Sequence, residues 1–155
     1  MSGIIGKAGT KSGIVGATLL SCDIGTWTPA FFGDSGCAAT MNVQKGQFTK
    51  IGKLVLAEFE ASVSAFSCSG ATHCTGLPFK SAKQTASEWV MGGWITYGSG
   101  LSVNNGINIQ CHIEPNAYHF YFRKWDTSTG TNNLPPGEVS ADGSLVGTLV
   151  YQTQE

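Results

Sequence analysis

The feature that most constrains the fold is a strict alternation of apolar and polar residues in two segments. In residues 53–65 the apolar side chains take every second position, at Val55, Ala57, Phe59, Ala61, Val63 and Ala65. In residues 107–114 they do the same, at Ile107, Ile109, Cys111 and Ile113. A period of two places one set of side chains on each face of a β-strand. Both segments are therefore predicted to be strands with one face in a core and one in water.

Strand signals and turn signals continue from residue 25 to the end of the chain. β-Branched and aromatic residues mark further strands at 27–32, 38–43, 47–51, 88–97, 118–125 and 145–153. Glycine-rich, serine-rich and asparagine-rich turns separate them, and no window has the spacing of an amphipathic helix. We predict an all-β, antiparallel, two-sheet β-sandwich of jelly-roll type over residues 25–155, with a closed barrel as the alternative.

The first 24 residues differ in pattern from the rest. Ser-Gly-Ile-Ile-Gly at residues 2–6 returns as Ser-Gly-Ile-Val-Gly at residues 12–16. Two short apolar pairs between glycines cannot nucleate a helix or form a core, so they are expected to be extended and to need another surface. We predict an anchoring arm over residues 1–24, with a frayed terminus as the alternative. Its docking residues are Ser2, Gly3, Ile4, Ile5, Gly6, Ser12, Gly13, Ile14, Val15 and Gly16.

Length and charge exclude several classes of protein. The 155 residues fit a single domain, and a net charge of −1 gives no basic surface for nucleic acid. No apolar run approaches the roughly 18 residues that cross a bilayer, and the N-terminus lacks the apolar stretch of a secretion signal. The sequence predicts a soluble, unsecreted protein that neither enters membranes nor binds nucleic acid.

The cysteines are expected to be small buried thiols. There are five, at Cys22, Cys37, Cys68, Cys74 and Cys111, an odd number in a chain large enough to form its own core. A bridge between Cys68 and Cys74 remains an alternative. We predict no metal site, because Cys111 and the adjacent His112 face opposite sides of a strand and because Cys68 and Cys74 are spaced too widely for a zinc knuckle.

Two motifs resemble catalytic ones and are assigned structural roles. Gly33-Asp34-Ser35-Gly36 matches the sequence around a protease serine, but all three histidines follow Ser35, whereas that family places its histidine before the serine. Glu58 and Glu60 lie on one strand face, but Ser62 and Ser64 continue the same polar stripe. We expect a turn and a solvated face, and hence no enzyme and no cofactor.

Residues 118–125 form a strand with two aromatic faces. His119, Tyr121, Arg123 and Trp125 share one face, and Tyr118, Phe120 and Phe122 share the other. A strand that is apolar on both faces packs inside the core, meets another subunit, or presents rings that stack on sugars. We favour subunit contact for His119, Tyr121, Arg123 and Trp125, and leave core packing and glycan contact as alternatives.

Four short motifs resemble the β-sandwich modules of tailed-bacteriophage virion proteins. They are GTWTPA at 25–30, GQFTKIGK at 46–53, TGLPFKS at 75–81 and GTLVYQT at 147–153. Such modules occur in tail fibres, tail spikes and capsid-surface proteins, and the repeated N-terminus is similar to that of small marine-phage proteins. The resemblance implies a homotrimer and carries no catalytic residue.

The resemblance and the arm together lead to a functional prediction. We expect a capsid decoration or cement protein on the virion surface, assembled in the host cytoplasm. Its arm would bind the major capsid protein or another virion protein while the jelly-roll knob points outward. The alternative is a tail-fibre or head-fibre tip that recognises a host surface glycan.

Overall fold

The computed structural model describes residues 21–83, 90–104, 106–127 and 130–154, with the side chains of Val90, Met91 and Thr127 left out. The predicted docking residues of the arm, at 2–6 and 12–16, lie outside these ranges. The first strand begins at Cys22, so Cys22–Ile24 belong to the sheet rather than to an arm.

The described residues form ten antiparallel strands and one short 3₁₀ turn, which confirms the all-β antiparallel prediction. In chain order they are β1 (Cys22–Trp27), β2 (Ala30–Gly33), β3 (Thr40–Ile51), β4 (Leu54–Ala65), β5 (Thr72–Thr75), β6 (Val90–Leu101), β7 (Ile109–Ile113), β8 (His119–Thr127), β9 (Gly130–Asn133), η2 (Pro136–Glu138) and β10 (Val139–Gln152). No helix in this part of the chain is long and apolar enough to span a membrane.

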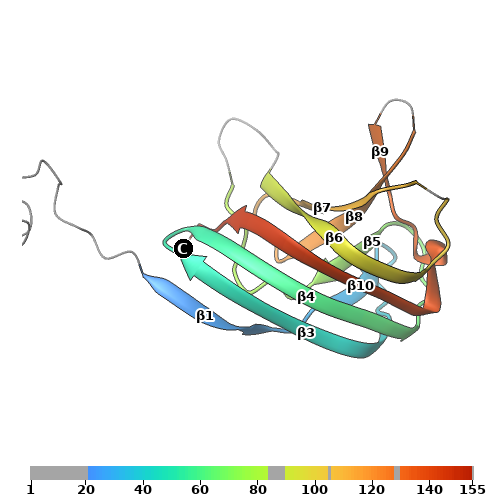
Figure 1. Cartoon of the computed structure of the whole chain (residues 1–155), viewed down its shortest axis with the longest axis horizontal. Helices are drawn as coiled ribbons and strands as arrows, with labels where there is room; N and C mark the ends of the chain where they lie inside the picture. The colour runs from blue at the N-terminus through green and yellow to red at the C-terminus, as the bar shows by residue number, and fades with distance from the viewer. Residues whose placement is uncertain (1–20, 84–89, 105, 128–129, 155) are drawn as a thin grey trace, which may run out of the picture.

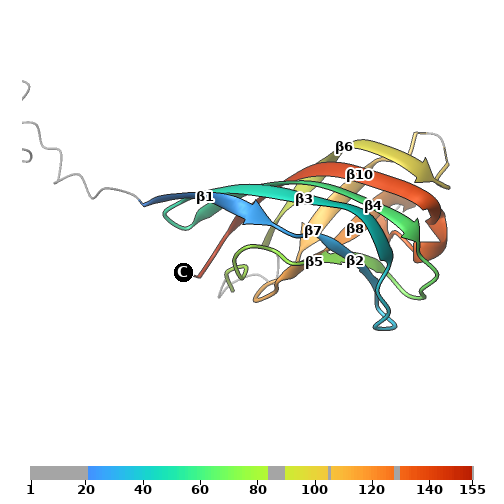
Figure 2. The same ribbon diagram turned by 90° about the horizontal axis from the view of Figure 1, so that it is seen from below.

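The strands form one curled sheet in place of the two predicted sheets. Its order is β1-β3-β4-β10-β6-β7-β8-β5-β2, with β9 added to β8. The sheet bends between β6 and β7, so that its two halves face each other across the core (Figures 1 and 2). We call β1, β3, β4, β10 and β6 the large half, and β7, β8, β5, β2 and β9 the small half. Because β6 pairs with β7, the two layers of the expected sandwich are continuous.

Phenylalanine rings join the two halves. Phe59 of β4 lies 5.3 Å from Phe120 and 6.3 Å from Phe122, both on β8, measured between ring centroids. Phe31 of β2 lies 5.3 Å from Phe122, edge to face. Phe31, Phe120 and Phe122 are completely buried. Burial of such rings is the main source of stability in a domain of this kind.

Large residues and glycines alternate along one row of the large half. The hydrogen-bonded strands align Trp27, Gly46, Phe59, Gly147 and Ile95 side by side. A Cβ added to Gly46 would lie 2.5 Å from the Trp27 ring, and one added to Gly147 would lie 2.8 Å from the Phe59 ring. The two glycines therefore leave the space that the neighbouring rings occupy.

The motifs of the phage resemblance are structural. The Trp27 indole N–H donates to the carbonyl oxygens of Gln47 and Glu58, 3.2 Å from each, and so ties β1 to the next two strands. Gly76 donates its N–H to the Tyr118 carbonyl oxygen. Its φ of 92° is a backbone conformation that residues with a side chain rarely adopt. The segment after Gly76 contacts β10 through Phe79. The Tyr151 hydroxyl of β10 donates to the Phe79 carbonyl and accepts from the Phe79 N–H.

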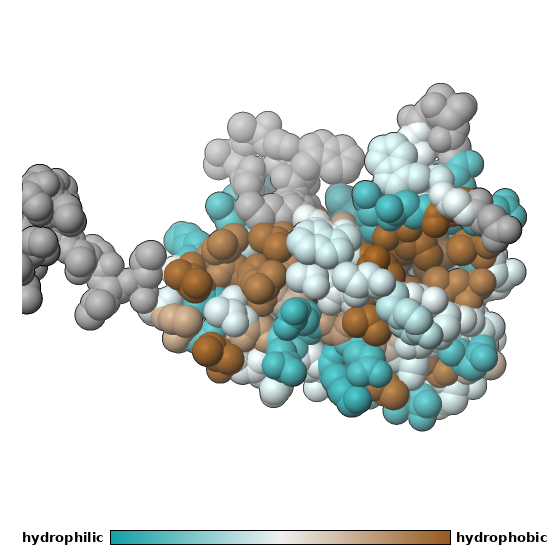
Figure 3. Space-filling model, in the orientation of Figure 1, coloured by the Kyte–Doolittle hydropathy of each residue, from teal (hydrophilic) through white to brown (hydrophobic). Residues whose placement is uncertain are grey.

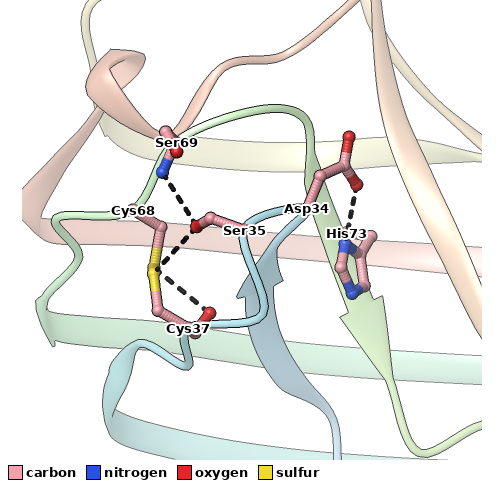
Figure 4. The surroundings of a disulfide bond; sticks show 6 residues. All are labelled: Asp34, Ser35, Cys37, Cys68, Ser69 and His73. Carbon is pink, nitrogen blue, oxygen red and sulfur yellow. Dashed lines mark hydrogen bonds and ion pairs between the residues drawn. A yellow bond between two sulfur atoms is a disulfide. The ribbon is translucent and has the colours of Figure 1, made fainter.

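A disulfide bond joins Cys37 to Cys68, with 5.9 Å between their Cα atoms (Figure 4). The prediction of unbridged thiols is wrong for this pair, and the alternative bridge from Cys68 to Cys74 does not form. Cys74 and Cys111 are buried thiols as expected, and burial raises the pKa of both. Cys22 is an exposed thiol.

The Gly-Asp-Ser-Gly motif forms the turn that approaches this disulfide. The Ser69 N–H donates to the Ser35 hydroxyl at 3.3 Å (Figure 4). The Ala71 N–H donates to an Asp34 carboxylate oxygen at 3.0 Å. Both contacts hold the 66–71 loop against the turn. The motif therefore forms a turn, as the sequence predicted.

Candidate functional site: the outer face of the small half

Strand β8 places the four predicted contact residues on one face. Phe120 and Phe122 point into the core, so His119, Tyr121, Arg123 and Trp125 point outward. Three of them are half-buried, and Trp125 is 53% exposed. The alternative in which these residues pack inside the core is wrong for this chain.

The register of the sheet brings rings from four strands into one row. Phe32 pairs with His73, His73 pairs with Tyr121, and Tyr121 pairs with His112. The Phe32 and His73 rings stack with centroids 5.9 Å apart, and the His73 and Tyr121 rings are 5.4 Å apart. Phe32, His73 and His112 were not among the predicted contact residues, because sequence parity places residues on a face only within one strand.

Two histidines on this face contact carboxylates. His73 Nδ1 lies 3.5 Å from Asp34 Oδ1, and His119 Nε2 lies 3.5 Å from Glu114 Oε2. The two imidazole rings are 5.5 Å apart. The two carboxylates of this cluster, Asp34 and Glu114, therefore each face an imidazole.

Burial lowers the pKa of two histidines on this face, His73 and His112. It lowers the pKa of His73, and the nearby His119 lowers it further, against the opposing effect of Asp34. Burial also lowers the pKa of His112, as does the charge of Arg123, while Glu114 opposes them. Burial and the nearby carboxylates raise the pKa of Tyr121, so its hydroxyl keeps its proton.

A hollow of about 420 Å³ opens on this face between β7, β8 and β9. We call it the β7–β9 hollow. Gln110 and His112 of β7, Arg123 and Trp125 of β8, and Thr131 of β9 line it. Within the described part of the chain, no carboxylate oxygen lies within 4.0 Å of the Arg123 guanidinium. The hollow thus combines a cation, an indole and several neutral polar groups.

Trp94 extends the same face and was not identified from the sequence. It is 52% exposed on β6 and pairs directly with Gln110, which in turn pairs with Arg123. The sequence marked residues 88–97 as a strand, but it contains no signal for which strand lies beside it. Only the pairing of β6 with β7 brings this second exposed indole near the hollow.

The outer face of the large half has a different character. Glu58 and Glu60 lie on it as a solvated stripe, where Lys45 pairs with Glu60 at 3.1 Å. Apolar side chains are exposed where β4 begins and β10 ends, near the C-terminus, and Figure 3 shows apolar surface there. The exposed residues around it are Ile24, Ile51, Leu54 and Leu56.

Among residues 21–83, 90–104, 106–127 and 130–154, no group of three or more histidine, cysteine, aspartate and glutamate side chains is arranged to hold a metal ion. The Ser35 hydroxyl accepts from the Ser69 N–H and lies 3.4 Å from the Cys37 sulfur. The outer face of the small half offers exposed or half-buried rings, neutral polar groups and the positive charge of Arg123.

Comparison with known proteins identifies the fold. No protein-family model matches the chain, and no curated protein matches it. The crystal structure of the Dettilon tailspike protein (gp208) is similar over 84% of this chain, with a TM-score of 0.72 and 19% sequence identity. The match covers 24% of the tailspike chain. This chain therefore has the fold of one part of that tailspike.

Proposed function

We propose that this chain is a structural protein on the surface of a tailed-bacteriophage virion. One observation carries the proposal, namely the match of most of the chain to a module of a phage tailspike, with a TM-score of 0.72. The four motifs that resemble phage virion modules fall on the parts that define this fold: β1, the β3–β4 hairpin, the Gly76 turn and β10. Fold alone does not specify function, so the proposal also depends on the site.

Within the virion, we assign the chain to the tail, as a module that contacts the host surface. Two features support this assignment. The solved structure that it resembles is a tailspike. In addition, two indoles are exposed beside a hollow lined by polar groups, Trp125 on the outer face of the small half and Trp94 on the adjoining strand β6. Exposed aromatic side chains around a polar hollow are typical of binding sites.

A second candidate is the capsid decoration or cement protein expected from the sequence. The repeated Ser-Gly-Ile-Ile-Gly and Ser-Gly-Ile-Val-Gly segments favour it, since a repeated apolar pair suits an arm that docks into a shell. In either location, a homotrimer would attach to the virion through three copies of the arm. Each bound arm would raise the effective concentration of the others and so strengthen a weak attachment.

Cryo-electron microscopy of the purified particle tests the location. Density for the curled sheet at the distal end of the tail would support the tail assignment. Density in a regular array on the shell would support decoration. Absence of the chain from purified virions, checked by mass spectrometry, would overturn both candidates.

A four-residue variant tests attachment through the arm without shortening the chain. Ile4, Ile5, Ile14 and Val15 are each replaced with Ser, and the far-ultraviolet circular dichroism must keep the β spectrum of the unchanged protein. Loss of the variant from particles would support an anchoring arm, whereas normal incorporation would contradict it.

A further inference from the structure

We propose that the β7–β9 hollow binds an anionic saccharide, with Trp125 against the sugar ring and Arg123 on the acidic substituent. This proposal builds on the host-contact function above and names the chemistry of the ligand at that site. Its basis is the set of groups that line the hollow and the charges that surround them.

Trp125 supplies the apolar wall. It is 53% exposed on β8 and lines the hollow beside Arg123. An indole face offers a wide, rigid surface that packs against the C–H face of a sugar while losing little conformational entropy. Trp94, exposed on the neighbouring strand β6, offers a second such surface for a longer chain of sugars.

Arg123 supplies the charge. Arg123 is half-buried and lines the hollow, and within the described residues its guanidinium has no carboxylate partner. Arginine binds carboxylates and phosphates with two parallel hydrogen bonds, which gives both strength and a defined orientation. An arginine in this position is suited to an anion that arrives with the ligand.

Among the described residues, the carboxylates on and beside this face pair with groups other than Arg123. Asp34 faces His73 and Glu114 faces His119, each at 3.5 Å. Asp126, the next carboxylate along β8, is bound by Lys124 at 3.0 Å and by the Asn132 amide at 3.0 Å. The positive charge at the hollow is therefore available to a ligand.

The other groups that line the hollow suit sugar hydroxyls. Gln110 and Thr131 can each donate and accept a hydrogen bond. Burial and the charge of Arg123 lower the pKa of His112, so this imidazole adds a neutral polar group rather than a second cation. The volume of about 420 Å³ lies within the range of small-molecule sites.

The test uses the full-length protein on an array of bacterial surface oligosaccharides. The array carries uronate-bearing, sialate-bearing and phosphate-bearing saccharides, each beside a neutral relative, together with inorganic phosphate and galacturonate monomers as competitors. We expect binding to acidic saccharides and at least about tenfold weaker binding to their neutral relatives, because a charged hydrogen-bonded pair is lost. Binding to neutral saccharides alone, or to no saccharide, would overturn the proposal.

Two variants and two matched controls assign the binding to this hollow. Arg123→Gln should abolish the preference for acidic saccharides, and Trp125→Ala should weaken binding to every saccharide about tenfold or more. Lys45→Gln and Tyr97→Ala remove an exposed cation and an exposed ring outside the hollow, and should leave binding unchanged. If the control variants weaken saccharide binding as much as Arg123→Gln and Trp125→Ala do, the hollow is not the binding site.

Analytical ultracentrifugation of the same variants separates ligand binding from subunit contact. An unchanged oligomeric state supports a ligand site, and dissociation caused by Arg123→Gln or Trp125→Ala would overturn it. The array measures binding without a virion, so it tests the ligand separately from the location. If the protein binds acidic saccharides but is absent from the tail, only the tail assignment is refuted. A tail protein that binds no acidic saccharide would refute the present inference alone.

Discussion

Gly147 lies directly opposite Phe59 across the β4–β10 pair, and the space left by its missing side chain is filled by the Phe59 ring. A Cβ at Gly147 would lie 2.8 Å from that ring and 2.8 Å from the carbonyl oxygen of Trp94. The ring could turn aside, but the carbonyl belongs to the β6 backbone. The Phe59 ring meets Phe120 and Phe122 of the small half, so this one glycine affects how the two halves pack.

Gly147→Ala is therefore expected to lower the free energy of unfolding by about 1–3 kcal/mol, the usual range for overpacking a core. Urea unfolding followed by tryptophan fluorescence measures the change. Gly137→Ala is the matched control, because a Cβ there would meet no atom within 4 Å. Equal stability of the two variants would show that the core accommodates a methyl group at Gly147.

The Cys37–Cys68 disulfide is predicted to stabilise the domain by restricting the unfolded chain. The two residues are 31 positions apart, which corresponds to about 3–4 kcal/mol in the chain-entropy description. Cys37→Ser combined with Cys68→Ser should lower the midpoint of urea unfolding, and a reducing agent should do the same to the unchanged protein. Cys22→Ser, at an exposed free thiol, is the control.

Peptide mapping without reduction checks the pairing itself. A crosslinked peptide pair containing Cys37 and Cys68 is expected. A pair containing Cys68 and Cys74 would show that the pairing described here is wrong, and the stability prediction would then fail with it.

Tyr151→Phe tests the link between the Gly76 turn and β10. The Tyr151 hydroxyl makes two hydrogen bonds, at 3.0 Å to the Phe79 carbonyl and at 3.3 Å from the Phe79 N–H. Removing the hydroxyl leaves both backbone groups without this partner, which is expected to cost about 1–3 kcal/mol. Thermal unfolding measures the loss, and amide exchange at Phe79 should accelerate. Tyr97→Phe, at an exposed ring, should have no effect on either.

Much of the strand pattern could be predicted, because alternation is a local property. Leu54–Ala65 and Ile109–Ile113 lie where the period of two placed them. The prediction of two strands at 38–43 and 47–51 is wrong, because residues 40–51 form the single strand β3, in which Gly46 makes room for the Trp27 ring. The predicted strand at 27–32 is broken, since Thr28 and Pro29 separate β1 from β2. The four-residue strands β5 and β9 are too short to show a period.

The site was predictable within one strand and unpredictable between strands. Parity along β8 correctly grouped His119, Tyr121, Arg123 and Trp125 on one face. Their neighbours His73, Gln110 and Trp94 come from three other strands, and their register depends on the packing of the whole sheet. The Cys37–Cys68 bond has the same origin, since the Asp34–Gly36 turn and the 66–71 loop meet only in the folded chain.

Acidification should destabilise the domain through His73 and His112. Their pKa values in the folded protein lie below the ordinary value of 6.5, mainly because of burial, so the unfolded chain binds protons more readily. Their contribution to stability is complete above pH 6.5 and declines as the pH falls from there through the lowered pKa values. Urea unfolding at pH 7.5, 6.5 and 5.5 should show this decline, and His73→Asn combined with His112→Asn should reduce it. Titration of the imidazoles by nuclear magnetic resonance checks the cause. A His73 midpoint above 6.5, with stability rising on acidification, would mean that the attraction of Asp34 outweighs burial.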